Sequence, residues 1–257
     1  MFKRAVLLLE LACLTAGASW ATDDPMVGDW KLNPRRSKLI DEMKVTKLGG
    51  NKCSFDFGGG RPETIAVDGT DQPGNFGTTL SVRVVTADEW MVVRKKDGRV
   101  EIRGIWTLSK DGNTLRDDYT EIGDNGKTMH VVYIYERRGG GPGFAGDWIS
   151  TSEQLETVYA EHVRPYESNG LSMSSSLDGV TKNLRFDGQD YPNAGTAANT
   201  LTSAQRVNER TVVLTDKIRG SIVQTREISV SKDGKTLTMT VHVPGRNDPD
   251  VLVFDRE

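Results

Sequence analysis

Arg226 and Gln224 are the residues whose type and spacing best fit ligand-binding chemistry. They lie two residues apart in a predicted strand on which Ile222, Ile228 and Val230 share one face. Because side chains two apart on a strand point to the same side, Gln224 and Arg226 lie on that face too. If it is a core face, the guanidinium needs a partner or water, and it could bind the carboxylate of a ligand.

Two other interpretations of this pattern stay open. Asp216 lies on the preceding predicted strand and could form an internal ion pair with Arg226, so it is the third candidate site residue. Alternatively, the polar face could point outward. The corresponding residues 122 positions earlier are Ile102 and Gly104, so the polar pair belongs to only one half of the chain.

Residue patterns for catalysis or metal binding are missing from the sequence. The 3 histidines have no metal-binding spacing, and Gly-x-Ser-x-Gly, His-Glu-x-x-His and Cys-x-x-Cys are absent. Asp117 and Asp118 are adjacent, but on a strand they point to opposite faces and do not form a catalytic pair. We therefore expect no enzymatic activity, no metal and no cofactor.

Three motifs occur twice with a nearly constant separation. They begin at residues 28 and 146, 109 and 231, and 135 and 254, which are separations of 118, 122 and 119. The pairs are Gly28–Trp30 with Gly146–Trp148, Ser109–Leu115 with Ser231–Leu237, and Tyr135–Arg137 with Phe254–Arg256. A repeat of this length is a whole domain, and 257 residues suit two domains.

Each half consists of short alternating apolar runs separated by Gly, Asn and Asp turns, a pattern typical of antiparallel sheets. The predicted fold class is all-β, with two tandem up-and-down barrels of about eight strands each. The strands should start near Trp30, Met43, Thr64, Thr78, Trp90, Val100, Leu115 and Thr128, and near Trp148, Leu171, Lys182, Thr200, Thr211, Ser221, Thr236 and Val251. The exception is Ser152–Glu161, whose residues favour a short helix.

The predicted organisation has four parts. Residues 1–21 are a signal peptide, 22–138 the first barrel, 139–143 a Gly-rich linker and 144–257 the second barrel. The signal has a basic start, an apolar stretch too short to span a membrane, and small residues at Ser19 and Ala21 before the cleavage point. We expect a secreted or periplasmic protein. We expect no lipid anchor, because Glu10 stands where the lipidation motif before Cys13 needs an aliphatic residue.

The motifs resemble those of lipocalin-like, calycin-type barrels, and in particular a small secreted bacterial unit of unknown role. Such barrels place the Trp of Gly-x-Trp across their closed end, against a late Arg. The resemblance implies that Trp30 packs with Arg137 and Trp148 with Arg256, as structural closures. It also implies a binding interior.

The leading hypothesis is non-catalytic binding of a small, hydrophobic or amphipathic ligand inside one or both barrels. A structural or protein-interaction module with filled barrels is the alternative, and a cavity enzyme of the cyclase or isomerase type is a further one. An internal cavity of roughly 300 Å³ or more would favour the ligand. The net charge of −3 and the absence of a basic stripe argue against a nucleic-acid partner, and no protein partner is indicated.

Overall fold

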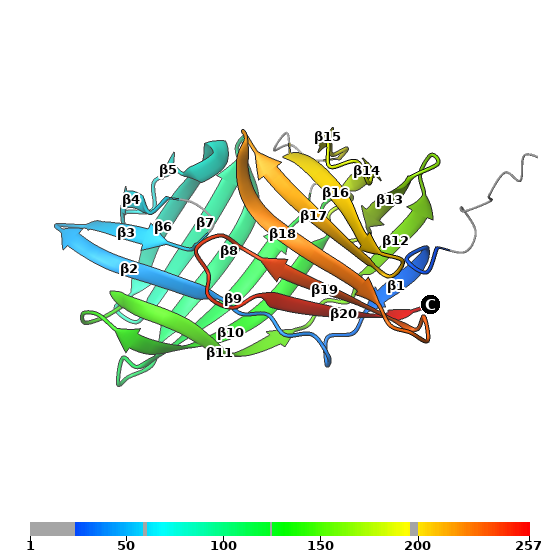
Figure 1. Cartoon of the computed structure of the whole chain (residues 1–257). Coiled ribbons are helices and arrows are strands. Elements are labelled where there is room, and N and C mark those ends of the chain that lie inside the picture. The colour runs from blue at the N-terminus through cyan, green and yellow to red at the C-terminus, as the bar shows by residue number, and fades with distance from the viewer. Residues whose placement is uncertain (1–23, 59–60, 124, 196–199) are drawn as a thin grey trace, which may run out of the picture.

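The computed structural model describes residues 24–58, 61–123, 125–195 and 200–257. Within these ranges the protein is built from antiparallel strands, and its one helical element is the 3₁₀ turn η1 (Asn75–Gly77). The strands form two sheets of ten, each curved into a nearly closed barrel (Figure 1). The predicted signal peptide lies outside the described residues.

The first sheet, called barrel I, has the strand order β4-β3-β2-β11-β10-β9-β8-β7-β6-β5. Its strands are β2 (Glu42–Gly49), β3 (Lys52–Asp56), β4 (Glu63–Ala66), β5 (Gln72–Pro73), β6 (Thr78–Thr86), β7 (Glu89–Lys96), β8 (Arg99–Leu108), β9 (Thr114–Ile122), β10 (Thr128–Gly139) and β11 (Gly146–Leu155).

The second sheet, called barrel II, has the order β14-β13-β12-β1-β20-β19-β18-β17-β16-β15. Its strands are β1 (Gly28–Leu32), β12 (Ala160–Pro165), β13 (Gly170–Ser175), β14 (Thr181–Arg185), β15 (Tyr191–Pro192), β16 (Thr200–Asn208), β17 (Thr211–Ile218), β18 (Ser221–Val230), β19 (Thr236–His242) and β20 (Asp250–Arg256).

The two ends of each sheet approach each other through a few polar contacts. In barrel I, the side-chain amide of Gln72 pairs with both backbone groups of Ala66, at 2.8 Å each, and so joins β5 to β4. In barrel II, Thr181 and Ala194 exchange two backbone hydrogen bonds of 2.9 Å. These contacts cover the edges that an open sheet would expose.

The sheets exchange one strand between the two sequence copies. β1, at the start of the first copy, lies between β12 and β20 of barrel II, and β11, at the start of the second copy, lies between β2 and β10 of barrel I. Segment 139–143 therefore connects two neighbouring strands of one sheet. The composition of the barrels thus differs from the predicted ranges 22–138 and 144–257.

The Trp–Arg stacks follow this exchange. The guanidinium of Arg256 lies 4.0 Å from the ring centre of Trp30, and that of Arg137 lies 4.2 Å from the ring centre of Trp148. The predicted pairing of Trp30 with Arg137 and of Trp148 with Arg256 was wrong. The residues and their stacking were correctly anticipated, but each tryptophan travels with its strand into the other barrel.

Both arginines are also held by backbone carbonyls. Arg256 donates to the carbonyls of Pro25, Val27 and Gly234, at 2.6, 2.8 and 2.5 Å. A Cβ at Gly28 would lie only 2.4 Å from an Nη atom of this guanidinium. The glycine of the Gly-x-Trp motif is thus explained by space, since any side chain would displace the arginine.

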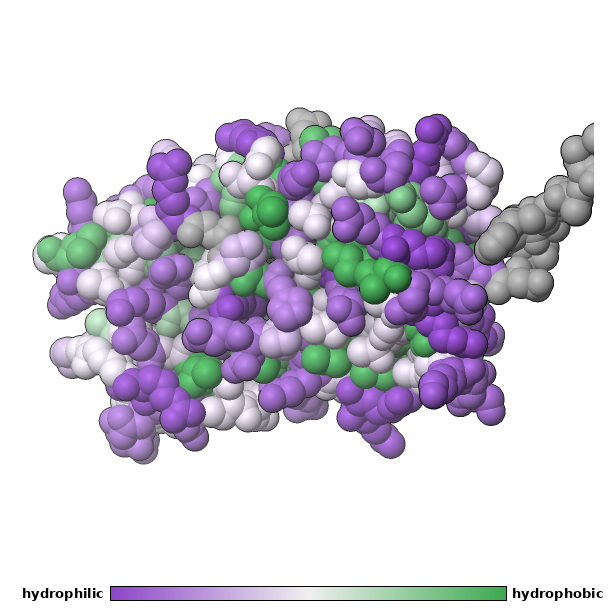
Figure 2. Space-filling model, viewed as in Figure 1, coloured by the Kyte–Doolittle hydropathy of each residue, from purple (hydrophilic) through white to green (hydrophobic). Residues whose placement is uncertain are grey.

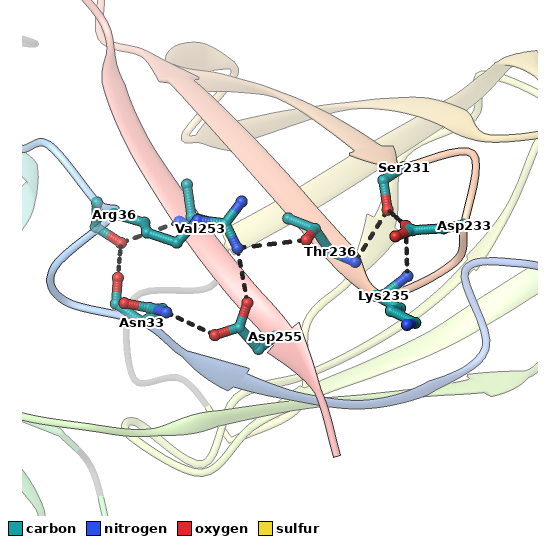
Figure 3. A network of polar contacts seen from close by, with 9 residues as sticks. Asn33, Arg36, Ser231, Asp233, Lys235, Thr236, Val253 and Asp255 are labelled. Carbon is teal, nitrogen blue, oxygen red and sulfur yellow. Dashed lines mark hydrogen bonds and ion pairs between the residues drawn. The ribbon is translucent and has the colours of Figure 1, made fainter.

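The chain that follows β1 is fastened to the other copy by polar contacts (Figure 3). Asp255 on β20 accepts hydrogen bonds from Asn33 at 2.6 Å and from Arg36 at 2.8 Å. The backbone N–H of Asn33 donates to the carbonyl of Val253, and Lys38 forms an antiparallel bridge with Val251. The segment from Asn33 to Lys38 therefore anchors β1 to β20 of barrel II before the chain continues into β2 of barrel I.

Two details of the predicted strands need correction. Each sheet has ten strands instead of eight, because the two-residue strands β5 and β15 are too short to show alternation and because β3 and β12 were not counted. The predicted helix Ser152–Glu161 is wrong, since its residues belong to the end of β11, the connection 156–159 and the start of β12. Pairing with β10 over Val131–Ile134 outweighs the helix propensity of this segment.

The barrels have separate apolar cores, and each core contains the exchanged strand. Trp30 and Leu32 are buried in the core of barrel II, whereas Trp148 is buried in that of barrel I. Barrel I is rich in aromatic packing, with the rings of Trp90 and Phe144 stacked 4.2 Å apart. The exchange is thus supported by buried side chains as well as by backbone pairing.

A double-mutant cycle tests the exchanged stacks. Combining Trp30→Leu with Arg256→Met should give a coupling of about 1 kcal/mol in the free energy of unfolding, because the ring and the guanidinium are in contact. Combining Trp30→Leu with Arg137→Met should be additive within about 0.5 kcal/mol. Chemical denaturation of the parent, the three single variants and the two double variants measures both, and coupling of Trp30 to Arg137 would contradict the strand exchange.

Candidate functional site

A cavity of about 410 Å³ is shared by the two barrels. Its apolar wall comes from both of them and includes Leu39, Met43, Phe57, Leu80, Val92, Ile102, Trp106, Met239, Val241 and Leu252. Its polar wall includes Asp41, Arg94, Asp117, Tyr119, Glu121, Tyr133, Tyr159, Glu161, Ser175, Asp178, Gln224, Arg226, Arg246 and Asp250. The site is therefore lined by both apolar and charged side chains.

The three predicted site residues meet inside barrel II. Asp216 on β17 is 3% exposed, and its carboxylate accepts hydrogen bonds from Arg226 and, at 2.7 Å, from Gln224 on β18. The internal ion pair with Asp216 is thus present, and Gln224 and Arg226 also line the cavity. The inward orientation of these side chains is confirmed.

Sequence reasoning missed two further partners of this carboxylate. Lys182 on β14 donates to Asp216 at 2.9 Å, and the buried hydroxyl of Thr202 on β16 also donates to it. Burial opposes ionisation of Asp216, but the charges of Arg226 and Lys182 hold its pKa well below the usual range. Asp216 is therefore a fixed anion facing two cationic side chains.

One donor of this cluster remains free. The Nε–H of Arg226 is buried and has no hydrogen-bond partner among the described residues. The side chain of Arg226 is 15% exposed and lines the cavity. An unpaired buried donor costs about 1–3 kcal/mol, which an acceptor on a bound molecule would recover.

Barrel I contains a second buried ion pair at the equivalent place. Glu63 on β4, whose side chain is 4% exposed, accepts two hydrogen bonds from Arg94 on β7, at 2.9 and 2.7 Å. The hydroxyl of Thr78 also accepts from this guanidinium, at 2.9 Å. The guanidinium of Arg94 is therefore already occupied by the protein.

The two pairs correspond with their charges reversed. Arg94 stands 122 residues before Asp216, and their cross-strand partners Ile102 and Gln224 are also 122 residues apart. Lys182, which also pairs with Asp216, likewise stands 119 residues after Glu63, the partner of Arg94. Applying the repeat offset to Asp216 would have located Arg94, but opposite charges at matched positions hid the relation from a search for similar residues.

Asp117 on β9 is the most isolated polar group of barrel I. It is 5% exposed and accepts a hydrogen bond from the indole N–H of Trp106, and its Oδ1 has no partner among the described residues. Burial raises its pKa well above the usual range, and the nearby carboxyls of Asp41 and Asp118 act in the same direction. Asp117 and Asp118 point to opposite faces of β9, as predicted.

The junction between the barrels has its own ion pair. Asp41, which lies between β1 and β2, contacts Arg246 from the β19–β20 connection at 2.5 Å and accepts from the hydroxyl of Tyr135 at 2.5 Å. Arg246 also donates to the carbonyl of Ile40 at 3.1 Å. These contacts fix the two barrels against each other beside the cavity.

Two groups in barrel II have pKa values near neutrality. Burial raises the pKa of Glu161 on β12 to about 7, although nearby Arg226 favours the ionised form. Burial, together with the charge of Arg226, lowers the pKa of Lys182 to about 8. The charge of this end of the cavity therefore changes over the pH range from about 7 to 8.

No family model, curated protein or solved structure matches this chain. The described residues contain no group of three or more His, Cys, Asp or Glu side chains placed to hold a metal ion. Across the same residues, no helix has the length and apolar character needed to cross a membrane. The chemistry of the site rests on the cavity and its charged side chains.

Removing the cation of the barrel I pair should be strongly destabilising. Arg94→Met leaves Glu63 buried without its cation, and the free energy of unfolding should fall by about 3–5 kcal/mol. Adding Glu63→Gln should restore a large part of this loss. Lys95→Met, which removes the more exposed ion pair with Asp71, is the control and should cost less than about 1 kcal/mol. Thermal or urea unfolding at neutral pH measures all three, and equal losses for Arg94 and Lys95 would contradict the assignment.

Glu161 should make stability depend on pH. Its folded pKa of about 7 lies above its usual 4.5, so the protein favours the neutral carboxyl and loses stability as the pH rises from about 4.5 through 7. Glu161→Gln should match the parent near pH 4 and exceed it near pH 8, by on the order of 3 kcal/mol. The exposed Glu227→Gln serves as the control. Parallel unfolding curves for parent and Glu161→Gln at all pH values would disprove the shift.

Proposed function

We propose that the protein binds a small amphipathic molecule in the cavity shared by its barrels, without chemical conversion of that molecule. The observation that carries the proposal is the buried, unpartnered Nε–H of Arg226 beside an apolar space of about 410 Å³. Cavities of this size suit small ligands, and a few convergent polar groups orient them.

The ligand carries an anionic group, such as a carboxylate, at the barrel II end. Arg226 and Lys182 place two cations beside the buried carboxylate of Asp216, and burial favours the neutral form of Glu161, the other buried acid near Arg226. A carboxylate at Arg226 would accept from the free Nε–H. The apolar wall of barrel I, with Phe57 and Trp106, suits the remainder of the molecule.

The alternative of a protein-interaction module has less support. The large hydrophobic residues exposed among the described positions are Leu48, Val84, Val85, Val158, Val207 and Ile222, and none is aromatic. On the face seen in Figure 2, apolar residues form small patches within a mostly hydrophilic surface. Protein interfaces are typically rich in aromatic residues at their centre.

The lipocalin type and the secreted location belong to the same proposal. The Gly-x-Trp motif with a stacked late arginine, present in each barrel, supports a lipocalin-like origin. The basic start and the apolar stretch within residues 1–21 support export. A small-molecule carrier outside the cytoplasm is consistent with both features.

The test compares octanoate with octanol by displacement of a fluorescent fatty-acid probe. The parent should prefer octanoate by about tenfold, because one charge-assisted hydrogen bond contributes about 1.5 kcal/mol or more. Arg226→Met removes the donor and leaves Asp216 paired with Lys182. It should lose this preference and keep its affinity for octanol. Failure of both probes to bind the parent would contradict the proposal.

A further inference from the structure

The environment of Asp117 differs from that of every other acidic residue described above. Its carboxyl accepts a hydrogen bond from the side chain of Trp106, Oδ1 has no hydrogen-bond partner among the described residues, and the residue lines the cavity. With 5% exposure, Asp117 is buried as deeply as an apolar core residue. A carboxyl group in such a place needs a partner that enters the cavity.

Gly104 on β8 leaves room beside this free oxygen. A Cβ at Gly104 would lie 2.7 Å from Oδ1 of Asp117, well inside a normal contact distance. The backbone of Gly104 is not in the left-handed region, so its conformation would accept another residue. The glycine is therefore explained by the room that the carboxyl of Asp117 needs.

The protein provides no cation for Asp117 within the described ranges. The charged groups that act on it are the carboxyls of Asp41 and Asp118, which repel a further negative charge. The nearby cations form ion pairs with other carboxylates, Arg94 with Glu63 and Arg246 with Asp41, although Nε of Arg246 has no hydrogen-bond partner among the described residues. In barrel II, by contrast, the buried Asp216 has two cations of its own.

Aromatic rings complete the surroundings. Trp106, Phe57, Tyr119 and Tyr133 line the same cavity as Asp117. Aromatic faces attract cations, most strongly where water is excluded. The unpaired carboxyl and the rings around it thus favour the same kind of ligand group.

We propose that Asp117 is a second polar subsite, which binds the ammonium group of an organic amine. This inference rests on the proposed function, because it concerns the same cavity. The ligand class becomes narrower: a molecule with an apolar middle, an acidic group that contacts Arg226 and an amino group that contacts Asp117. Gly104 is a specificity-determining position, because a side chain there would displace the carboxyl of Asp117.

Three chain-matched probes test the subsite, namely octanoate, ω-hydroxyoctanoate and ω-aminooctanoate, with octylamine as a probe that lacks the acid. In the parent, ω-aminooctanoate should bind at least tenfold more tightly than octanoate. Asp117→Asn keeps the shape and can still accept from Trp106, so it should fold. It should abolish the tenfold gain and leave octanoate binding unchanged. Gly104→Ala, which leaves Asp117 in place, should also abolish the gain.

The outcomes separate the two proposals. If octanoate binds but the amino group adds no affinity, or if the gain survives in Asp117→Asn, the amine subsite is refuted and the proposed function stands. If octanoate fails and octylamine binds in a way that depends on Asp117, the subsite stands and the anionic end is refuted. An equal gain for ω-hydroxyoctanoate would show a hydrogen-bonding site without charge preference and would also overturn the amine assignment. If none of the four binds, both proposals fall.

Discussion

The stacking of an arginine on a tryptophan from the other sequence copy is the interaction on which the architecture depends. Arg256 joins Trp30 to the last strand of barrel II, and Arg137 joins Trp148 to barrel I. Each guanidinium also donates hydrogen bonds to several backbone carbonyls. These bonds connect the chain before the tryptophan to a hairpin. These contacts add to the backbone pairing of β1 with β12 and β20 and to the burial of Trp30, which together hold this five-residue strand in the other barrel.

The sequence was sufficient for the fold class but not for the partners. Alternating patterns identify strands and faces, and they offered the inward position of Arg226 next to Asp216 as one of several alternatives. The pairing of each tryptophan with its arginine could not be derived in this way. Trp30 and Trp148 have the same local motif, so either arginine could stack on either ring. Local patterns contain no information that distinguishes two equivalent positions more than a hundred residues apart. The short strand β5 and the strand conformation within Ser152–Glu161 were not predicted for a different reason. Pairing with neighbouring strands determines these elements, and local propensity does not.

The two interiors show how duplicated barrels diverge while staying stable. A buried carboxylate with its cation occurs at one position in both, but the acid and the base have changed places between Glu63–Arg94 and Lys182–Asp216. The reversal preserves neutrality at that position, which burial requires. The differences that are not balanced in this way lie elsewhere, at Gly104 with Asp117 and at Gln224 with Arg226. Those unbalanced positions border the shared cavity, which is where the chemistry of the molecule is concentrated.

The strand exchange has a consequence for how the chain can fold as it is made. All strands of barrel I lie between residues 42 and 155, so this barrel can close while the rest of the chain is still being synthesised. Barrel II needs β1, at residues 28–32, to pair with β20, at residues 250–256. Nearly the full length of the chain separates these two strands, and contacts of such long range form slowly. Barrel I is thus a natural template, and β1 can pair with β12 (Ala160–Pro165) before β20 arrives to complete its other edge.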